Sequence, residues 1–122
     1  MAKKQLPNLS GAETEILSIL WKTEPATVQQ ICDNLPSERD ITYATVQTLL
    51  RRLEKKGYIA HKTQGKAHVF YPAVKSEDVI KRSVGDFVDK LFGGDPVPLV
   101  HYLAKHGKIT AEDIKELKKI IK

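Results

Sequence analysis

The chain has 122 residues, of which 41% are apolar and 29% are charged. This balance predicts one folded domain, or two small units on one polypeptide, and excludes an intrinsically disordered chain. The sequence has no apolar run near the ~20 residues of a membrane span, no apolar segment of a secretory signal near its N-terminus, and a single cysteine, which excludes an internal disulfide framework. We therefore expect a cytoplasmic protein.

Two short helices are predicted in the first third of the chain. Ser10 and Glu13 have the S-x-x-E spacing of a capping box, which satisfies free backbone N–H groups where a helix begins. Apolar residues then recur at helical spacing until Pro25 ends this helix. Thr27 is the expected N-cap of a second helix, VQQICDNL. Its apolar side includes Cys32, for which we expect burial and not a reactive thiol.

A third helix is predicted in the segment TYATVQTLLRRLEKKG, beginning after Thr42 and ending at Gly57. One side of it is apolar and comprises Val46, Leu49, Leu50 and Leu53. The opposite side carries small or polar residues near its N-terminus and cationic residues near its C-terminus, namely Ala44, Thr45, Gln47, Thr48, Arg51, Arg52 and Lys55. The first group suits base edges and thymine methyl groups, and the second group suits phosphates.

After this helix the pattern becomes β-rich, which predicts a hairpin. We expect strands at Tyr58–Thr63 and Ala67–Tyr71, joined by a tight turn around Gly65. The aromatic residues of these strands are expected to pack in the core. Three helices followed by a hairpin is the order of a winged helix-turn-helix, in which the third helix lies in the DNA major groove.

Lys62, Lys66 and His68 cluster at the expected tip of the hairpin, where a wing would meet the sugar-phosphate backbone. Lysines also protect the edge strands of sheets, so either lysine taken singly fits solubility as well as DNA binding. We expect His68 to be a packed or bridging residue and not a metal ligand.

The positive charge is concentrated in the same region. The whole chain has a net charge of +5, whereas residues 43–75 hold seven lysines and arginines against one acid, Glu54, and have a net charge of +6. Such a block is typical of a protein that binds a polyanion, although a solvated lysine-rich face would have the same charge. An ordinary amphipathic surface helix mixes glutamate and lysine more evenly than the third predicted helix does. The scarcity of acids in that helix therefore favours DNA binding.

From Ser76 onwards the pattern is helical again. We expect one helix from Ser76 to a glycine pair, a second from Pro96 to about His106, and a third after its N-cap, Thr110. So small a helical unit leaves too much surface exposed to bury its apolar stripes alone. We therefore expect a homodimer through residues 76–122. The expected core of its interface comprises Phe87, Leu91, Leu103, Leu117 and Ile121.

The fold class predicted from these patterns is mainly α with a small β-hairpin. It places a winged helix-turn-helix DNA-binding domain at residues 1–75 and a C-terminal helical dimerisation domain at residues 76–122.

The chain also resembles a known family, the penicillinase repressors of the BlaI/MecI type, from about Leu9 to Ile121. Three segments carry the resemblance: LSGAETEILSILWK, TYATVQTLLRRLEKKGYIAHKTQGKAHVFYPAV and GGDPVPLVHYLAKHGKITAEDIKELKKII. The resemblance implies a homodimeric bacterial transcriptional repressor with an N-terminal winged helix. Members of the family repress resistance operons, such as those for β-lactamase or an alternative penicillin-binding protein, and a copper-responsive branch exists.

The resemblance also implies roles for single residues. Ala44, Thr45 and Thr48 fall at positions of base contacts, and Tyr43, Gln47 and Arg52 fall at positions that hold the DNA backbone. The full set of expected DNA-binding residues is Thr42, Tyr43, Ala44, Thr45, Gln47, Thr48, Arg51, Arg52, Lys55, Lys62, Lys66 and His68.

The sequence departs from the family in two places. The family's inducing cut falls at an Asn-Phe bond, and the corresponding pair here is Tyr102-Leu103, which puts release by the usual protease in doubt. An inducing protease therefore stays a candidate partner only. The copper branch has a cysteine-rich C-terminal motif, whereas this chain ends in KELKKIIK, so we expect no copper sensing by that route.

The sequence carries no signature of an enzyme. The sequence has no glycine-rich phosphate loop, paired carboxylates or Ser-His-Asp set, and its four histidines and one cysteine fit no metal spacing, so we expect neither an enzyme nor a cofactor. His101 and His106 are expected at a surface or interface. A small-molecule- or metal-responsive winged-helix regulator of an unrelated operon stays open as the alternative. The basic helix argues against a purely structural dimerisation module.

Overall fold

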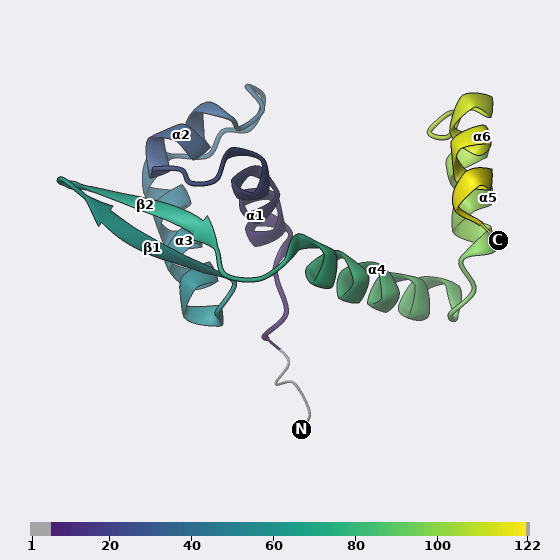
Figure 1. Cartoon of the computed structure of the whole chain (residues 1–122), viewed down its shortest axis with the longest axis horizontal. Coiled ribbons are helices and arrows are strands. Elements are labelled where there is room, and N and C mark those ends of the chain that lie inside the picture. Colours follow the sequence, from purple (N-terminus) through teal and green to yellow (C-terminus); the bar gives the residue numbers. More distant parts are fainter. Residues whose placement is uncertain (1–5, 122) are drawn as a thin grey trace. The chain divides into compact units, whose positions relative to one another are not determined.

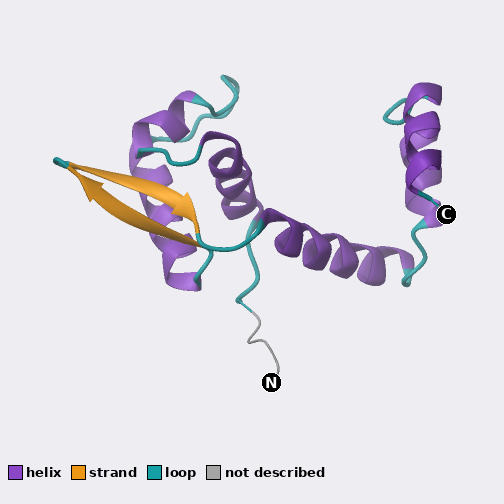
Figure 2. Cartoon of the chain, in the orientation of Figure 1, coloured by secondary structure: helices purple, strands orange, loops and turns teal. Residues whose placement is uncertain are grey.

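The computed structural model describes residues 6–121. The chain divides after Ser76 into two compact units, which we call the N-terminal and C-terminal units. The elements in chain order are α1 (Gly11–Thr23), α2 (Val28–Asp33), α3 (Tyr43–Lys56), β1 (Ile59–Gln64), β2 (Ala67–Pro72), α4 (Ser76–Phe92), α5 (Val97–Lys105) and α6 (Ala111–Ile120) (Figure 1). Figure 2 shows the same path as helices followed by one hairpin and then helices again. The mainly helical fold with a small hairpin is thereby confirmed.

Helices α1 and α2 begin at the side chains that the sequence indicated. The backbone N–H of Glu13 donates to Ser10 Oγ at 3.1 Å, and the N–H of Ser10 donates to Glu13 Oε1 at 2.8 Å. Thr27 and Gln30 make the same reciprocal pair at the start of α2. Because these bonds satisfy backbone donors that lack partners inside the helix, they fix where each helix begins.

The core of the N-terminal unit lies between its three helices and the base of the hairpin. Its buried apolar side chains are Ile16, Leu17, Leu20, Ala26, Val28, Ile31, Val46, Leu49, Leu50, Leu53, Tyr58, Ile59, Val69 and Phe70. The hairpin is joined to the loop before α2 by two backbone hydrogen bonds between Ala26 and Phe70, of 2.9 and 2.8 Å. Because the apolar stripe predicted for α3 is buried in this core, it is the side of α3 that packs on α1 and α2.

Cys32 is half-buried, less than the sequence predicted. Helix α2 ends at Asp33, two residues before the expected end of the segment VQQICDNL, because the N–H of Asn34 bonds back to Ile31 O at 3.1 Å. Burial, followed by the neighbouring Asp33 charge, raises the pKa of the Cys32 thiol above its ordinary value. The thiol therefore stays protonated at neutral pH, which disfavours a reactive cysteine.

The first strand of the hairpin lies one residue later in the chain than the sequence predicted, whereas β2 begins at Ala67 as predicted and extends one residue further, to Pro72. Strand β1 begins at Ile59 and not at Tyr58, because the N–H of Tyr58 still bonds to Leu53 O, at 3.0 Å, and so belongs to the end of α3. Gly57 makes this ending possible with a φ of 93°, a conformation that favours glycine. The antiparallel register pairs Ile59 with Pro72 and Gln64 with Ala67, so the turn consists of Gly65 and Lys66 alone.

The C-terminal unit has the expected helices, but they bury little. Its last helix begins after Thr110, the predicted N-cap, which forms a capping box with Asp113. Among its described side chains Val88 alone is buried. Ile121, expected on the stripe of the last helix, lies just beyond α6 and is 73% exposed.

Candidate nucleic-acid interface

Helix α3 presents a long exposed face opposite its buried stripe. All the residues predicted there are exposed except Gln47, which is half-buried. The exposed set is Thr42, Tyr43, Ala44, Thr45, Thr48, Arg51, Arg52 and Lys55. Neutral and hydroxyl-bearing side chains precede the cations along the helix. The face can therefore offer hydrogen-bonding groups to bases at one end and positive charge to phosphates at the other.

The threonine hydroxyls of this face are held in defined positions. Thr42 caps the helix by accepting the N–H of Thr45 at 3.1 Å, and the two hydroxyl oxygens lie 2.9 Å apart. Thr48 Oγ1 donates to Ala44 O at 3.1 Å. A hydroxyl has one donor and two acceptor lone pairs. The oxygen of Thr48 is therefore free to accept a hydrogen bond, such as one from a base amino group in the major groove.

The two faces of the hairpin have different chemistry. Lys62 lies on the face turned away from α3, with its Nζ 5.5 Å from the centre of the Tyr71 ring, where a cation–π contact favours it. Lys66 lies in the turn and is exposed. His61, His68 and Phe70 share the other face and line an open pocket of about 300 Å³ with residues of α3.

The α3 side of this pocket is a single stripe, because Gln47, Arg51 and Glu54 recur at helical spacing. The structure thus brings together three predicted site residues, Gln47, Arg51 and His68. It adds two that sequence reasoning missed, Glu54 and His61. Two signals could have found them: the helical spacing from Gln47 to Glu54, and the alternation of β1, which places His61 on the face of Phe70.

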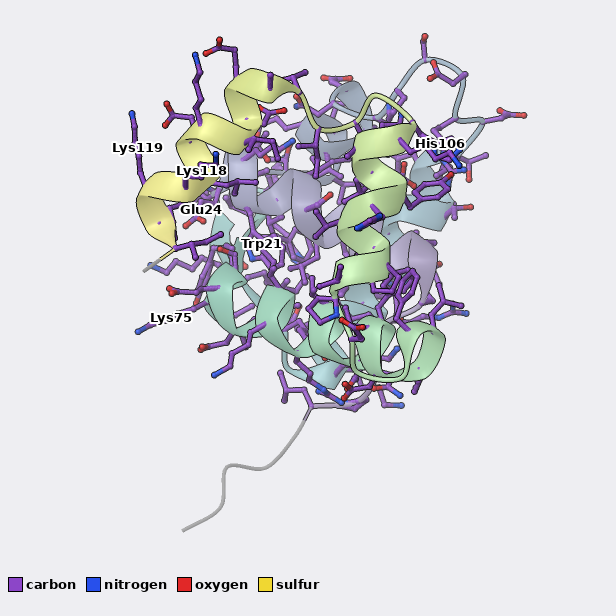
Figure 3. The ribbon with its side chains drawn as sticks, turned by 90° about the vertical axis from the view of Figure 1, so that its right-hand side faces the viewer. Trp21, Glu24, Lys75, His106, Lys118 and Lys119 are labelled. Atoms are coloured by element: carbon purple, nitrogen blue, oxygen red, sulfur yellow. The ribbon has the colours of Figure 1, made fainter. Side chains whose placement is uncertain are left out.

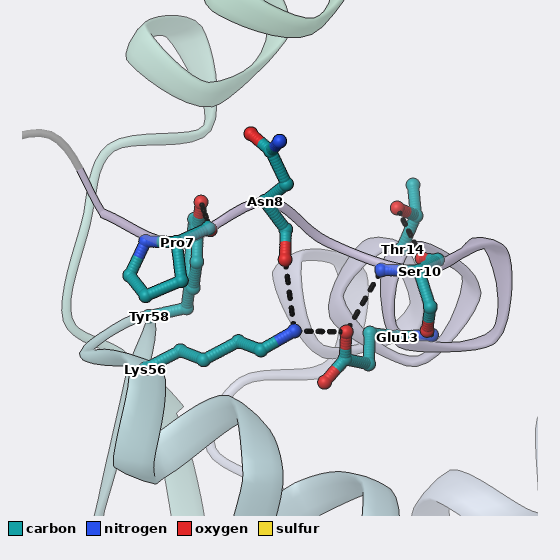
Figure 4. A network of polar contacts seen from close by, with 7 residues as sticks. All are labelled: Pro7, Asn8, Ser10, Glu13, Thr14, Lys56 and Tyr58. Atoms are coloured by element: carbon teal, nitrogen blue, oxygen red, sulfur yellow. Dashed lines mark hydrogen bonds and ion pairs between the residues drawn. The ribbon is translucent and has the colours of Figure 1, made fainter.

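Lys56, another cation of the basic block, points toward Asn8 and Glu13 at the start of α1 (Figure 4). Its Nζ lies 2.6 Å from Glu13 Oε1 and donates to Asn8 O at 2.8 Å. Glu13 is 1% exposed. Burial alone would raise the pKa of this carboxyl, but hydrogen bonds from Lys56 and Ser10 and the Lys56 charge outweigh it and leave the pKa below 4.5. Lys56 therefore serves the fold.

The residues predicted for dimerisation are mostly exposed apolar side chains of the C-terminal unit. Phe87, Leu91, Leu117 and Ile121 are 48%, 64%, 40% and 73% exposed, and Leu103 is half-buried. Tyr102 is 54% exposed, and the ring of His106 stacks on it with centres 4.1 Å apart. Figure 3 labels His106 at the end of α5.

Residues 6–121 contain no group of three histidine, cysteine or acidic side chains that could hold a metal ion. No helix in this part of the chain is long and apolar enough to cross a bilayer.

Comparison with known proteins gives one consistent family. The model of the family described as "Penicillinase repressor" matches residues 9–122. The methicillin resistance regulatory protein MecI of Mammaliicoccus sciuri is 29% identical over 113 residues, which are 93% of this chain and 92% of that protein. The transcriptional regulator BlaI of Mycobacterium tuberculosis is 32% identical over 121 residues, which cover 94% of this chain and 84% of that protein.

Solved structures agree with this assignment. The structure of Bacillus licheniformis BlaI, in its monomeric form and in complex with the blaP half-operator, matches with a TM-score of 0.53 and 30% identity. The match covers 62% of this chain and 93% of that one. It confirms the winged-helix fold that the order of helices and hairpin predicted.

Proposed function

The chain belongs to the penicillinase repressor family, and we propose that it is a transcriptional repressor that binds a palindromic operator as a homodimer. The family is one of repressors and not of enzymes. The names of the relatives point to an operon for β-lactam resistance or a related stress response as the regulated target. The proposed localisation is the cytoplasm, because a bacterial repressor binds its operator there.

The observation that carries this proposal is the exposed face of α3. It presents Thr48 and its neighbours beside Arg51 and Arg52, on a helix whose other side is fixed in the core. A BlaI structure that matches the same fold is a complex with a half-operator. The arrangement therefore supports the insertion of α3 into the major groove.

In this arrangement the residues of the face divide into those that contact bases and those that hold the DNA backbone. Ala44, Thr45 and Thr48 contact base edges, while Tyr43, Gln47 and Arg52 hold the DNA backbone. Thr42, Arg51 and Lys55 flank these contacts, and Lys62, Lys66 and His68 place the hairpin on the backbone as a wing. Contacts to phosphates position the protein, whereas contacts to bases select the sequence.

The second half of the proposal is dimerisation through residues 76–122, with residues 1–75 as the DNA-binding domain. Its support is the number of large apolar side chains that α4, α5 and α6 leave exposed. The exposed side chains are Ile80, Val84, Phe87, Leu91, Val97, Val100, Tyr102, Ile114, Leu117, Ile120 and Ile121, each at least 36% exposed. A second copy would cover these stripes and relate two reading helices by a two-fold axis, which matches the symmetry of a palindrome.

The test is selection of bound fragments from the source genome by the full chain. We expect enrichment of a few sites that share a palindrome. The matched variants are R51A/R52A on α3 and K118A/K119A on α6, where Lys119 extends away from the helix (Figure 3). Both remove two positive charges, but only the first should abolish enrichment. Equal losses of enrichment in both variants would mean that DNA binding depends on the net charge of the protein alone.

A further inference from the structure

Three side chains form a continuous contact from α3 across the hairpin. His61 Nδ1 on β1 lies 2.8 and 2.9 Å from the two carboxylate oxygens of Glu54 on α3. The ring of His61 stacks on that of His68 on β2, with centres 4.6 Å apart and planes 11° from parallel. It also meets the Phe70 ring, at 5.6 Å. The outer part of the hairpin is thus tied to α3 through Glu54.

This contact lies outside the buried core. The side chains of His61 and Glu54 are 33% and 36% exposed, whereas Phe70 at the base of the hairpin is 6% exposed. Phe70 and its bonds to Ala26 fix where the hairpin leaves the core. The residues beyond His61, from Thr63 to Ala67, are all exposed. The direction of the tip therefore depends on what holds the hairpin at His61 and His68.

Apart from its contact with His61, Glu54 is unfavourable for DNA binding. It is the single acid among residues 43–75, beside Arg51 and Lys55 on the helix that reads DNA. A carboxylate there repels phosphates. Its carboxylate is held instead against His61 of the hairpin.

We propose that Glu54 and His61 are positioning residues, which hold the wing at the angle where Lys66 and His68 meet the DNA backbone while α3 reads the bases. The inference rests on the proposed DNA-binding function. Two other uses of the cluster fit the geometry less well. Parallel rings do not aim their nitrogens at one point, as a metal ion would require, and the Glu54 carboxylate opposes a bound anion.

The experiment compares E54A with E54Q in the full chain. Both variants remove the same negative charge, but glutamine keeps an oxygen that can accept the His61 N–H. Binding is measured to a duplex carrying the palindrome from the genomic selection and to a scrambled duplex of the same composition. We expect E54A to weaken operator binding about tenfold, as the loss of one side-chain hydrogen bond allows. E54Q should restore most of that loss.

Two further readouts test the positioning role. On the scrambled duplex E54A should also lose affinity and E54Q should keep most of it, because the wing contacts phosphates that every duplex has. Adding H61A to E54A should cost no further operator affinity, since the two residues act through one contact. Thermal unfolding of each variant shows whether the N-terminal unit is still folded.

Equal strengthening of operator binding in E54A and E54Q would overturn the inference, because Glu54 would then be only a surface acid. Additive losses in E54A/H61A would overturn it as well. If the unmodified chain does not distinguish operator from scrambled duplex, the proposed function itself fails, and the inference with it.

Discussion

The Lys56 ammonium lies 2.6 Å from Oε1 of Glu13, a buried carboxylate 43 residues earlier in the chain. The pair joins the end of α3 to the start of α1, and the carbonyl of Asn8 accepts from the same ammonium (Figure 4). The other carboxylate oxygen, Oε2, is buried and has no hydrogen-bond partner. Lys56 is therefore the main compensation for a charge taken out of water, while Lys55 beside it is exposed.

Replacing Lys56 with methionine should destabilise the N-terminal unit strongly. Loss of one partner of a buried ion pair costs about 3–5 kcal/mol, because the other charge stays buried and uncompensated. K55M, at the exposed neighbouring position, should change stability by no more than about 0.5 kcal/mol. Urea unfolding followed by the fluorescence of Trp21, the single tryptophan, reports on this unit. Similar midpoints for K56M and K55M would show that the pair contributes little.

The same pair predicts a stability that depends on acid pH. Because the pKa of Glu13 lies below 4.5 in the folded chain, its contribution is complete above pH 4.5 and is lost as pH falls through the folded pKa. E13Q lacks this contribution. It should be less stable than the unmodified chain near neutral pH and should lose less stability on acidification. The measurement is the urea midpoint from about pH 7 to about pH 3. Parallel curves for the two proteins would contradict the prediction.

Lys66 and Thr48 should affect DNA binding in different ways. K66A should weaken all duplexes alike and reduce the salt slope by about one for each wing, because it removes a phosphate contact. T48A should leave the salt slope unchanged and alter the preferred base at one position in each half-site. Salt titrations and binding to a set of single-base operator variants measure the two effects. A uniform loss in T48A would mean that this residue does not read sequence.

The apolar side of α6 should control assembly. L117Q places a glutamine in the proposed interface of both copies. K118Q is the matched control, because it places a glutamine at the next position, where the side chain is a charged lysine. Burial of a leucine is worth about 1.5–3 kcal/mol, so L117Q should weaken dimerisation by about tenfold or more while K118Q should not. Sedimentation at micromolar concentration measures both. A monomeric unmodified chain at that concentration would rule out the proposed dimer.

Induction by the family's usual cut should fail at Tyr102-Leu103. A protease site that hydrogen-bonds an asparagine amide rejects a side chain without it by as much as about 10⁴-fold. The double variant Y102N/L103F recreates the family pair and should become cleavable. Mass spectrometry of the protein from antibiotic-induced cells measures this. Fragments of the unmodified chain ending at Tyr102 would show that tyrosine is accepted.

Most of the fold could be predicted from the sequence because its signals are local. The capping box of Ser10 and Glu13, the apolar stripe of α3 and the glycine that ends it each lie within a few residues of the structure they determine. The start of β1 was wrong by one residue, because Tyr58 continues the hydrogen bonding of α3 and no local pattern distinguishes the two states.

The parts that the sequence could not give depend on packing between elements. Glu13 was expected only to cap its helix, yet the approach of α3 buries it and brings Lys56 to it. The pairing of Glu54 with His61 likewise follows from the position of the hairpin over α3. The individual DNA contacts on α3 stay predictions, since they depend on a partner molecule as well as on this chain.

The exposed stripes of α4, α5 and α6 have a consequence for gene dosage. If only a second copy covers them, folding of the C-terminal unit and association of two chains are one equilibrium. The concentration of repressor in the cell then determines how much of it is a folded dimer. Operator occupancy then falls more steeply than the number of chains, because two chains are needed for each functional unit. Dilution during growth, or a modest rise in turnover, would release the operon without any inducer bound to the protein.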